Sequence, residues 1–136
     1  MTGSTLADDL LIRRKKVREA LVRAGMDGIL LASDVNIYYM TGRVFNGYFF
    51  LSADGEAQCF VRRPIDFTGE QVTFIRRPDD LTAYFKAQGR PLPQRLMLEA
   101  DGLSYNDYTR LATLFSPAET GLFLSVPEKF KSRLNI

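Results

Sequence analysis

The sequence predicts an α/β fold: a single three-layer domain in which a mixed β-sheet is flanked by helices. Two observations predict it. Segments with helical periodicity alternate with short apolar or β-branched segments along the 136 residues, and such alternation places helices on the faces of a sheet. The composition, 46% hydrophobic and 25% charged, is that of an ordinary globular protein. The length corresponds to one domain, so we expect residues 6–136 to form it and residues 1–5 to be a disordered tail.

The first quarter of the chain predicts a helix, a strand and a second helix. An amphipathic helix is predicted over residues 6–24, where apolar residues recur at helical spacing: Leu10, Val17, Leu21 and Ala24. Gly25 ends it, because glycine adopts the left-handed conformation without steric penalty. The continuous apolar run at residues 28–32 predicts a strand covered on both faces. Ser33 then caps a short helix over residues 34–40.

A β-hairpin is predicted next. Residues 48–52 and 56–61 are strand-like and flank an Asp-Gly turn at residues 54–55, which is a strong hairpin signal. Pro64 ends the pairing because proline has no N–H to donate. Residues 71–75 are β-branched and aromatic and predict a third strand of this part of the sheet.

The remaining elements continue the alternation. A helix is predicted over residues 78–88, with Pro78 as its first residue and two aspartates in its first turn. Residues 95–99 predict a strand. Ser104 opens a helix that runs to about residue 115, in a sequence that resembles a capping box. Two further elements complete the pattern: a strand at residues 119–124 and a helix at residues 127–134.

Several functions are disfavoured by the residues themselves. The chain has no histidine, so the commonest general base and metal ligand are missing. The net charge of +2 is too small to indicate a nucleic-acid partner, and the basic residues of the first helix fit a solvated face. The single cysteine, Cys59, fits a reducing compartment, and we expect a buried, unreactive thiol. No segment is long and apolar enough to predict a membrane partner. Glu99 and Asp101 alternate as a metal-binding pair could, but hydrogen bonding at a loop and helix entry fits them better.

One stretch is more specific than the rest: residues 36–42 read Asn-Ile-Tyr-Tyr-Met-Thr-Gly. Three other segments accompany it: Gly-Met-Asp-Gly-Ile-Leu-Leu at 25–31, Leu-Glu-Ala-Asp at 98–101 followed by Ser104 and Tyr108, and Lys-Ser at 131–132. With these motifs the chain resembles the N-terminal domain of the creatinase/prolidase family, from about residue 14 to residue 132.

The resemblance implies a ribonuclease H-like fold and a non-catalytic accessory role in an Xaa-Pro dipeptidase or aminopeptidase P. It implies a catalytic domain, outside these residues, that holds two divalent metal ions (Mn, Co or Zn) on two Asp, one His and two Glu. None of these ligands can be assigned here, so we expect no cofactor and no peptidase activity from this chain alone. The expected partners are that catalytic domain, a second copy in a homodimer, and proline-containing peptides. Neither nucleic acid nor membrane is expected, and the expected location is the cytoplasm.

The resemblance also places the loop after residues 36–42 near a substrate entrance. The candidates for substrate-side contacts are Tyr39, Arg43, Phe45 and Asn46. An arginine can hold a peptide carboxylate through two hydrogen bonds, and an aromatic ring can pack on proline. Core packing is the alternative for the aromatic residues. At Arg43 the chain departs from the family, which more often has an aromatic or aliphatic residue there.

Two other functions stay open at this point. One is a peptide- or histone-binding module from a catalytically inactive relative of the same family. The other is the N-terminal domain of a creatine-type amidinohydrolase, which differs in substrate rather than in fold.

Overall fold

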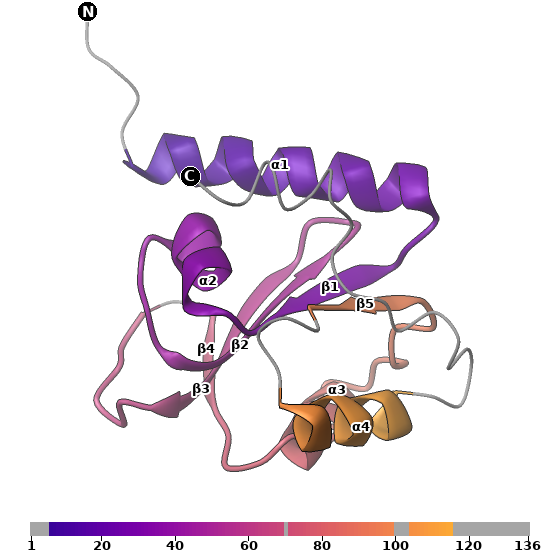
Figure 1. The fold of residues 1–136 in the computed structure, drawn as a ribbon. Coiled ribbons are helices and arrows are strands. Elements are labelled where there is room, and N and C mark those ends of the chain that lie inside the picture. The colour runs from indigo at the N-terminus through magenta and orange to yellow at the C-terminus, as the bar shows by residue number, and fades with distance from the viewer. Residues whose placement is uncertain (1–5, 70, 100–103, 116–136) are drawn as a thin grey trace, which may run out of the picture.

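A five-stranded mixed sheet runs through the molecule in the order β4-β3-β2-β1-β5 (Figure 1). The structure is a computed structural model, and it describes residues 6–69, 71–99 and 104–115. The strands are β1 Gly28–Leu31, β2 Asn46–Ser52, β3 Ala57–Arg63, β4 Val72–Phe74 and β5 Leu96–Leu98. Strands β1, β2 and β3 pair antiparallel, whereas β5 joins β1 and β4 joins β3 in parallel. The predicted mixed sheet is therefore confirmed.

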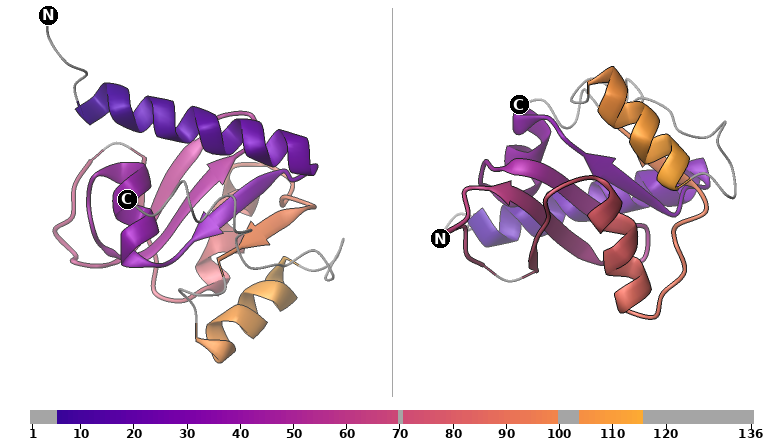
Figure 2. Two further views of the ribbon diagram at one scale, coloured as in Figure 1. Left: turned by 45° about the horizontal axis from the view of Figure 1, so that its top comes forward. Right: turned by 90° about the horizontal axis from the view of Figure 1, so that it is seen from below.

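Helices cover both faces of this sheet (Figures 1 and 2). They are α1 Leu6–Ala24, α2 Asp34–Thr41, α3 Asp79–Ala87 and α4 Tyr105–Leu114. Helices α1 and α2 pack on one face and α3 and α4 on the other, so the described residues form three layers. The predicted tail, the predicted elements at 119–124 and 127–134, and Asp101 and Lys131-Ser132 all lie outside the described residues.

The buried apolar residues form two clusters, one on each face of the sheet, because successive side chains of the central strands point to opposite faces. Ile29 of β1 and its partner Leu51 of β2 face α1 and α2, whereas Leu30 and its partner Phe50 face α3 and α4. All four residues of β1 are buried, as the continuous apolar run predicts. Each large side chain buried in this way contributes about 1.5–3 kcal/mol, so the sheet is held from both sides.

Helix α1 follows the prediction in its second half and departs from it at the end. Val17 and Leu21 are buried, and Gly25 has the left-handed φ of +72° that ends the helix. Ala24, however, is exposed. The chain turns at Gly25, so Met26 enters the core in its place, with its N–H donating to the carbonyl of Leu21 at 2.9 Å.

Side chains accept backbone N–H groups near the starts of α3 and α4, although the N-terminus of α3 has no side-chain cap. Pro78 lies one position before α3 rather than at its first residue. The Asp80 carboxylate accepts the N–H groups of Arg76 at 2.7 Å and Arg77 at 3.3 Å, which fixes the chain entering the helix. At α4, Ser104 Oγ accepts the N–H of Asp107 at 3.1 Å, so the predicted capping serine is confirmed.

Candidate functional site

Helix α2 carries the motif of residues 36–42, and a buried carboxylate holds its first turn. Glu99, directly after β5, is 3% exposed. Its Oε1 accepts the N–H groups of Ala32 at 2.7 Å and Ser33 at 2.8 Å, and its Oε2 accepts the hydroxyl of Ser33 and the side-chain amide of Asn36. Ser33 Oγ in turn accepts the N–H of Asn36 at 3.3 Å. These bonds agree with the prediction that Glu99 serves a helix entry rather than a metal.

Two arginines of α1 hold the other end of α2. Arg13 Nη1 donates to the carbonyl of Tyr39 and Arg14 Nε to the carbonyl of Met40, both at 3.0 Å. Cations are favourable there because the last carbonyls of a helix carry partial negative charge. The Arg13 guanidinium also lies 4.8 Å from the centre of the Tyr39 ring. These arginines were expected on a solvated face, and that expectation is wrong for the side that meets α2.

Arg14 is the more enclosed of the two. Its guanidinium lies 5.1 Å from the centre of the Phe49 ring of β2. Burial lowers the pKa of Arg14 from its ordinary value, although the neighbouring Cys59 opposes this. Cys59 itself is half-buried rather than fully buried, and its burial raises the pKa of the thiol, with Arg14 and Arg43 opposing. The direction of this shift agrees with the expectation of an unreactive thiol.

Hydrogen bonds fix the start of the loop at residues 41–47, where α2 ends. Gly42 has the left-handed φ of +74° and its N–H donates to the carbonyl of Tyr38 at 2.7 Å, which ends the helix. Thr41 Oγ1 donates to the carbonyl of Ile37 at 2.7 Å and accepts the N–H of Arg43 at 3.1 Å. The first half of the loop is thus bonded back onto the last turn of α2.

A second loop, residues 64–69, packs against the first. Phe45 is 3% exposed, and its ring meets that of Phe67 edge-to-face with the centres 5.0 Å apart. The Arg43 guanidinium lies 3.6 Å from the centre of the same ring and donates to the carbonyl of Thr68. Phe67 therefore joins the two loops through one aromatic and one cationic neighbour.

The end of the loop is fixed where it enters β2. Asn46 Oδ1 accepts the Nε–H of Arg62 at 3.0 Å, and the Arg62 guanidinium lies 5.3 Å from the centre of the Tyr48 ring. Between Asn46 and Gly47 the pairing with β3 shifts register. A Cβ on Gly47 would lie 1.9 Å from the carbonyl oxygen of Phe60, so only glycine fits this bulge.

The four predicted substrate-side residues have different surroundings. Arg43 and Asn46 are exposed, Tyr39 is half-buried against α1, and Phe45 is buried. The structure brings Arg43 and Phe45 together on Phe67 but gives Tyr39 and Asn46 other partners. Because the Phe45 ring is enclosed in the core, it is not available to pack on a proline. The sequence did not predict that Phe67, Arg13 and Arg14 hold this region. Their contacts join segments that are far apart in the sequence, so no local pattern indicates them.

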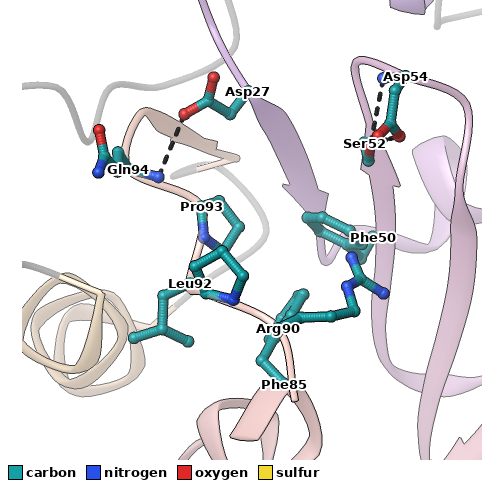
Figure 3. A pocket seen from close by; sticks show the side chains of 10 residues that line it. Asp27, Phe50, Ser52, Asp54, Phe85, Arg90, Leu92, Pro93 and Gln94 are labelled. Carbon is teal, nitrogen blue, oxygen red and sulfur yellow. Dashed lines mark hydrogen bonds between the residues drawn. The ribbon is translucent and has the colours of Figure 1, made fainter. Parts of the chain in front are cut away.

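A cavity of about 270 Å³ lies at the opposite end of β2 (Figure 3). Its polar groups already have partners within the chain. The Asp27 carboxylate accepts the N–H groups of Gln94 at 3.2 Å and Arg95 at 3.0 Å, and Arg90 forms an ion pair with Glu56. The bonds of Asp27 join the residue before β1 to the segment before β5. None of the four predicted residues lines this cavity.

The outer side of α2 forms an apolar hollow of about 430 Å³, lined by Asp34, Val35, Tyr38 and Val44. Val35, Tyr38 and Val44 are 55%, 49% and 52% exposed. The hollow adjoins the loop at residues 41–47, because Val44 belongs to that loop. Contiguous exposed apolar side chains are typical of an interaction surface.

The described residues do not offer a metal centre. Within residues 6–69, 71–99 and 104–115 no three His, Cys, Asp or Glu side chains gather in a way that could hold an ion. The sequence has no histidine, so a metal pair bound through His does not fit this chain. None of the described helices combines the length and apolar character needed to cross a bilayer.

Comparison with known families decides the assignment. The Creatinase/Prolidase N-terminal domain family matches residues 13–128, which is most of the chain. The chain belongs to this family. The resemblance drawn from residues 36–42 and the accompanying motifs is confirmed, and so is the expected α/β fold with a mixed sheet flanked by helices.

Solved structures share the fold of this creatinase/prolidase N-terminal domain. The Xaa-Pro dipeptidase from Bacillus anthracis is 20% identical, with a TM-score of 0.66 over 92% of this chain and 35% of that chain. The N-terminal domain of cytoplasmic peptidase PepQ from Mycobacterium tuberculosis H37Rv is 19% identical, with a TM-score of 0.68 over 90% of this chain and 98% of that chain. An Xaa-Pro aminopeptidase from Streptococcus thermophilus is 19% identical, with a TM-score of 0.66 over 92% and 97% of the two chains. No curated protein sequence matches. The chain thus spans about a third of the B. anthracis protein.

Proposed function

We propose that this chain is the accessory, non-catalytic N-terminal domain of a metal-dependent Xaa-Pro dipeptidase or aminopeptidase, and that it contributes to dimerisation and to the substrate entrance. The observation that carries the proposal is the family match over residues 13–128, in a chain that corresponds to about a third of the B. anthracis dipeptidase. The metal pair and the reaction centre then belong to another domain. A cytoplasmic location is part of the same proposal.

The surroundings of α2 support the role at an entrance. A binding loop works best when a rigid scaffold presents it, and α2 is held by Glu99 at its start and by Arg13 and Arg14 at its end. On the loop that follows, the exposed Arg43 uses only Nη1 within the described part of the chain. Its other N–H groups are free to donate to a peptide carboxylate.

The absence of a reaction centre is tested with the purified chain and Mn²⁺, Co²⁺ or Zn²⁺. We expect no stoichiometric metal binding by calorimetry and no hydrolysis of Xaa-Pro dipeptides, with a full-length Xaa-Pro dipeptidase assayed in parallel. Tight metal binding together with turnover would overturn the proposal, because both would require ligands within this chain.

The entrance role is tested by NMR titration with Xaa-Pro and Xaa-Ala dipeptides. We expect shifts at residues 39–46 with both dipeptides, because they share the carboxylate that Arg43 would bind, and we expect these shifts to disappear in Arg43→Gln. Arg76→Gln is the matched control, because Arg76 is an exposed arginine elsewhere on the surface. No response at residues 39–46, or an unchanged response in Arg43→Gln, would contradict the role of this loop.

A further inference from the structure

Helix α2 is apolar on two opposite sides. One side is buried in the domain and includes Ile37 and Met40. The other carries Val35 and Tyr38, which together with Val44 of the following loop form the α2 outer face, each about half exposed. A helix that is apolar all round is normally covered all round. The α2 outer face therefore has the composition of a surface that another molecule covers.

Opposite charges lie at the two ends of this face. The carboxylate of Asp34 is exposed in the first turn of α2 and lines the hollow. At the other end of the helix, the exposed Arg43 lies directly after the C-cap residue Gly42 and forms the basic end. The face thus runs from an acidic end to a basic end, with apolar side chains between them.

We propose that a second copy of this chain covers the α2 outer face, with the two α2 helices antiparallel about a two-fold axis. A two-fold interface pairs a surface with itself, so the surface must be self-complementary. In the antiparallel arrangement Val35 of one copy meets Val44 of the other, the two Tyr38 rings meet near the axis, and Asp34 lies beside the basic end. A parallel arrangement would instead oppose Asp34 to Asp34, which is unfavourable. The inference rests on the proposed function, which includes dimerisation, and it names the surface and the orientation.

The aromatic side chain at the centre and the charges at the edge match the usual division of an interface. Tyrosine is enriched in interface cores because it offers a large area and few rotatable bonds, whereas charged groups occupy the rim. Tyr38 is therefore expected to dominate the affinity, and the pairing of Asp34 with the basic end to select the orientation.

The test is sedimentation velocity of the purified chain over a concentration series. We expect a monomer–dimer equilibrium whose Kd rises at least tenfold in Tyr38→Ala and in Asp34→Arg. Two matched controls lie on the outer side of α1: Val22→Ala, which removes a valine that is 64% exposed, and Glu19→Arg, which reverses an exposed charge. Both controls should leave the Kd within a factor of two. Circular dichroism verifies that each variant is folded.

A charge exchange tests the orientation. Arg43→Glu should also weaken the dimer, because it opposes acid to acid. Mixing Asp34→Arg with Arg43→Glu should restore dimers as heterodimers, since each basic end then meets an acidic one.

The outcomes separate the surface from the function. A dimer that is insensitive to Tyr38→Ala and Asp34→Arg would overturn the assignment of this face and leave dimerisation standing. A chain that stays monomeric at every concentration would overturn both the face and the dimerisation, while the entrance role is decided by the peptide titration.

Discussion

Asn36 and Glu99 are 63 residues apart in the sequence, and in the interior the side-chain amide of Asn36 donates to Glu99 Oε2. Both side chains are buried. The carboxylate at the end of the edge strand β5 thus also binds the first turn of α2. Hydrogen bonds to a charged acceptor are stronger than neutral ones. This contact connects the most family-specific stretch of the sequence to the sheet and holds the candidate site in place.

Replacing Glu99 should therefore loosen α2 before the rest of the domain. Glu99→Gln puts an amide N–H₂ among groups that are all donors, and hydrogen bonds to charged groups contribute about 1.5–3 kcal/mol each. We expect the free energy of unfolding to fall by about 2–3 kcal/mol in urea denaturation, with faster hydrogen exchange at residues 33–41. Glu19→Gln, on an exposed position, is the control. A loss below about 0.5 kcal/mol, the size of an ordinary surface effect, would show that the network contributes little.

Removing Arg14 should free the other end of α2. Arg14→Ala loses the hydrogen bond to the Met40 carbonyl and the contact with the Phe49 ring, and we expect about 1–2 kcal/mol of destabilisation. Arg14→Lys should recover only part of it, because an ammonium lacks the planar stacking surface. Lys15→Ala, at the exposed neighbouring position, should change the unfolding free energy by less than about 0.5 kcal/mol. Equal effects of the alanine variants at 14 and 15 would contradict the capping role.

Two glycines separate the effect of space from that of backbone conformation. Both have positive φ, but a Cβ on Gly47 would lie 1.9 Å from the Phe60 carbonyl oxygen, whereas a Cβ on Gly89 would meet nothing within 4 Å. Gly89→Ala should cost about 1 kcal/mol. Gly47→Ala should cost more than about 3 kcal/mol, or shift the pairing of β2 with β3, because backbone cannot move aside cheaply. Thermal unfolding of the two variants, measured in parallel, tests this difference. Similar losses of stability in both would contradict the close approach of Gly47 to the Phe60 carbonyl.

The ion pair between α3 and α4 predicts a dependence of stability on pH. Hydrogen bonds from the Arg110 guanidinium hold the pKa of Asp79 below its ordinary value, and Asp79 holds the pKa of Arg110 above its own. A carboxylate whose pKa is depressed by folding stabilises the folded state above its unfolded pKa, and this stabilisation is lost as the pH falls through the folded pKa. We expect an NMR titration of the Asp79 carboxyl to move up towards the ordinary value in Arg110→Gln, and high salt to reduce the difference. An unchanged titration would contradict the pairing.

The sequence predicted the fold more completely than it predicted the surroundings of the candidate site residues. The loop at residues 41–47 and the exposure of Arg43 and Asn46 agree with a surface loop after a capped helix. Phe45 was a candidate for contact with substrate, yet its ring is in the core because Phe67, from a separate loop, encloses it. Which side a loop residue faces depends on the segment that packs beside it, and no local pattern encodes that.

The sequence by itself determined the elements of this domain and where they end. Ser33 and Ser104 cap helices, Gly25 and Gly42 end them, and the Asp-Gly turn joins the hairpin, because each of these effects acts between residues a few positions apart. Only the tertiary structure decided that Glu99 anchors α2, that α1 supplies the arginines at its other end, and that the described part of the chain leaves the α2 outer face exposed. Those features depend on contacts between segments tens of residues apart, whose geometry follows from the packing of the whole sheet rather than from local periodicity.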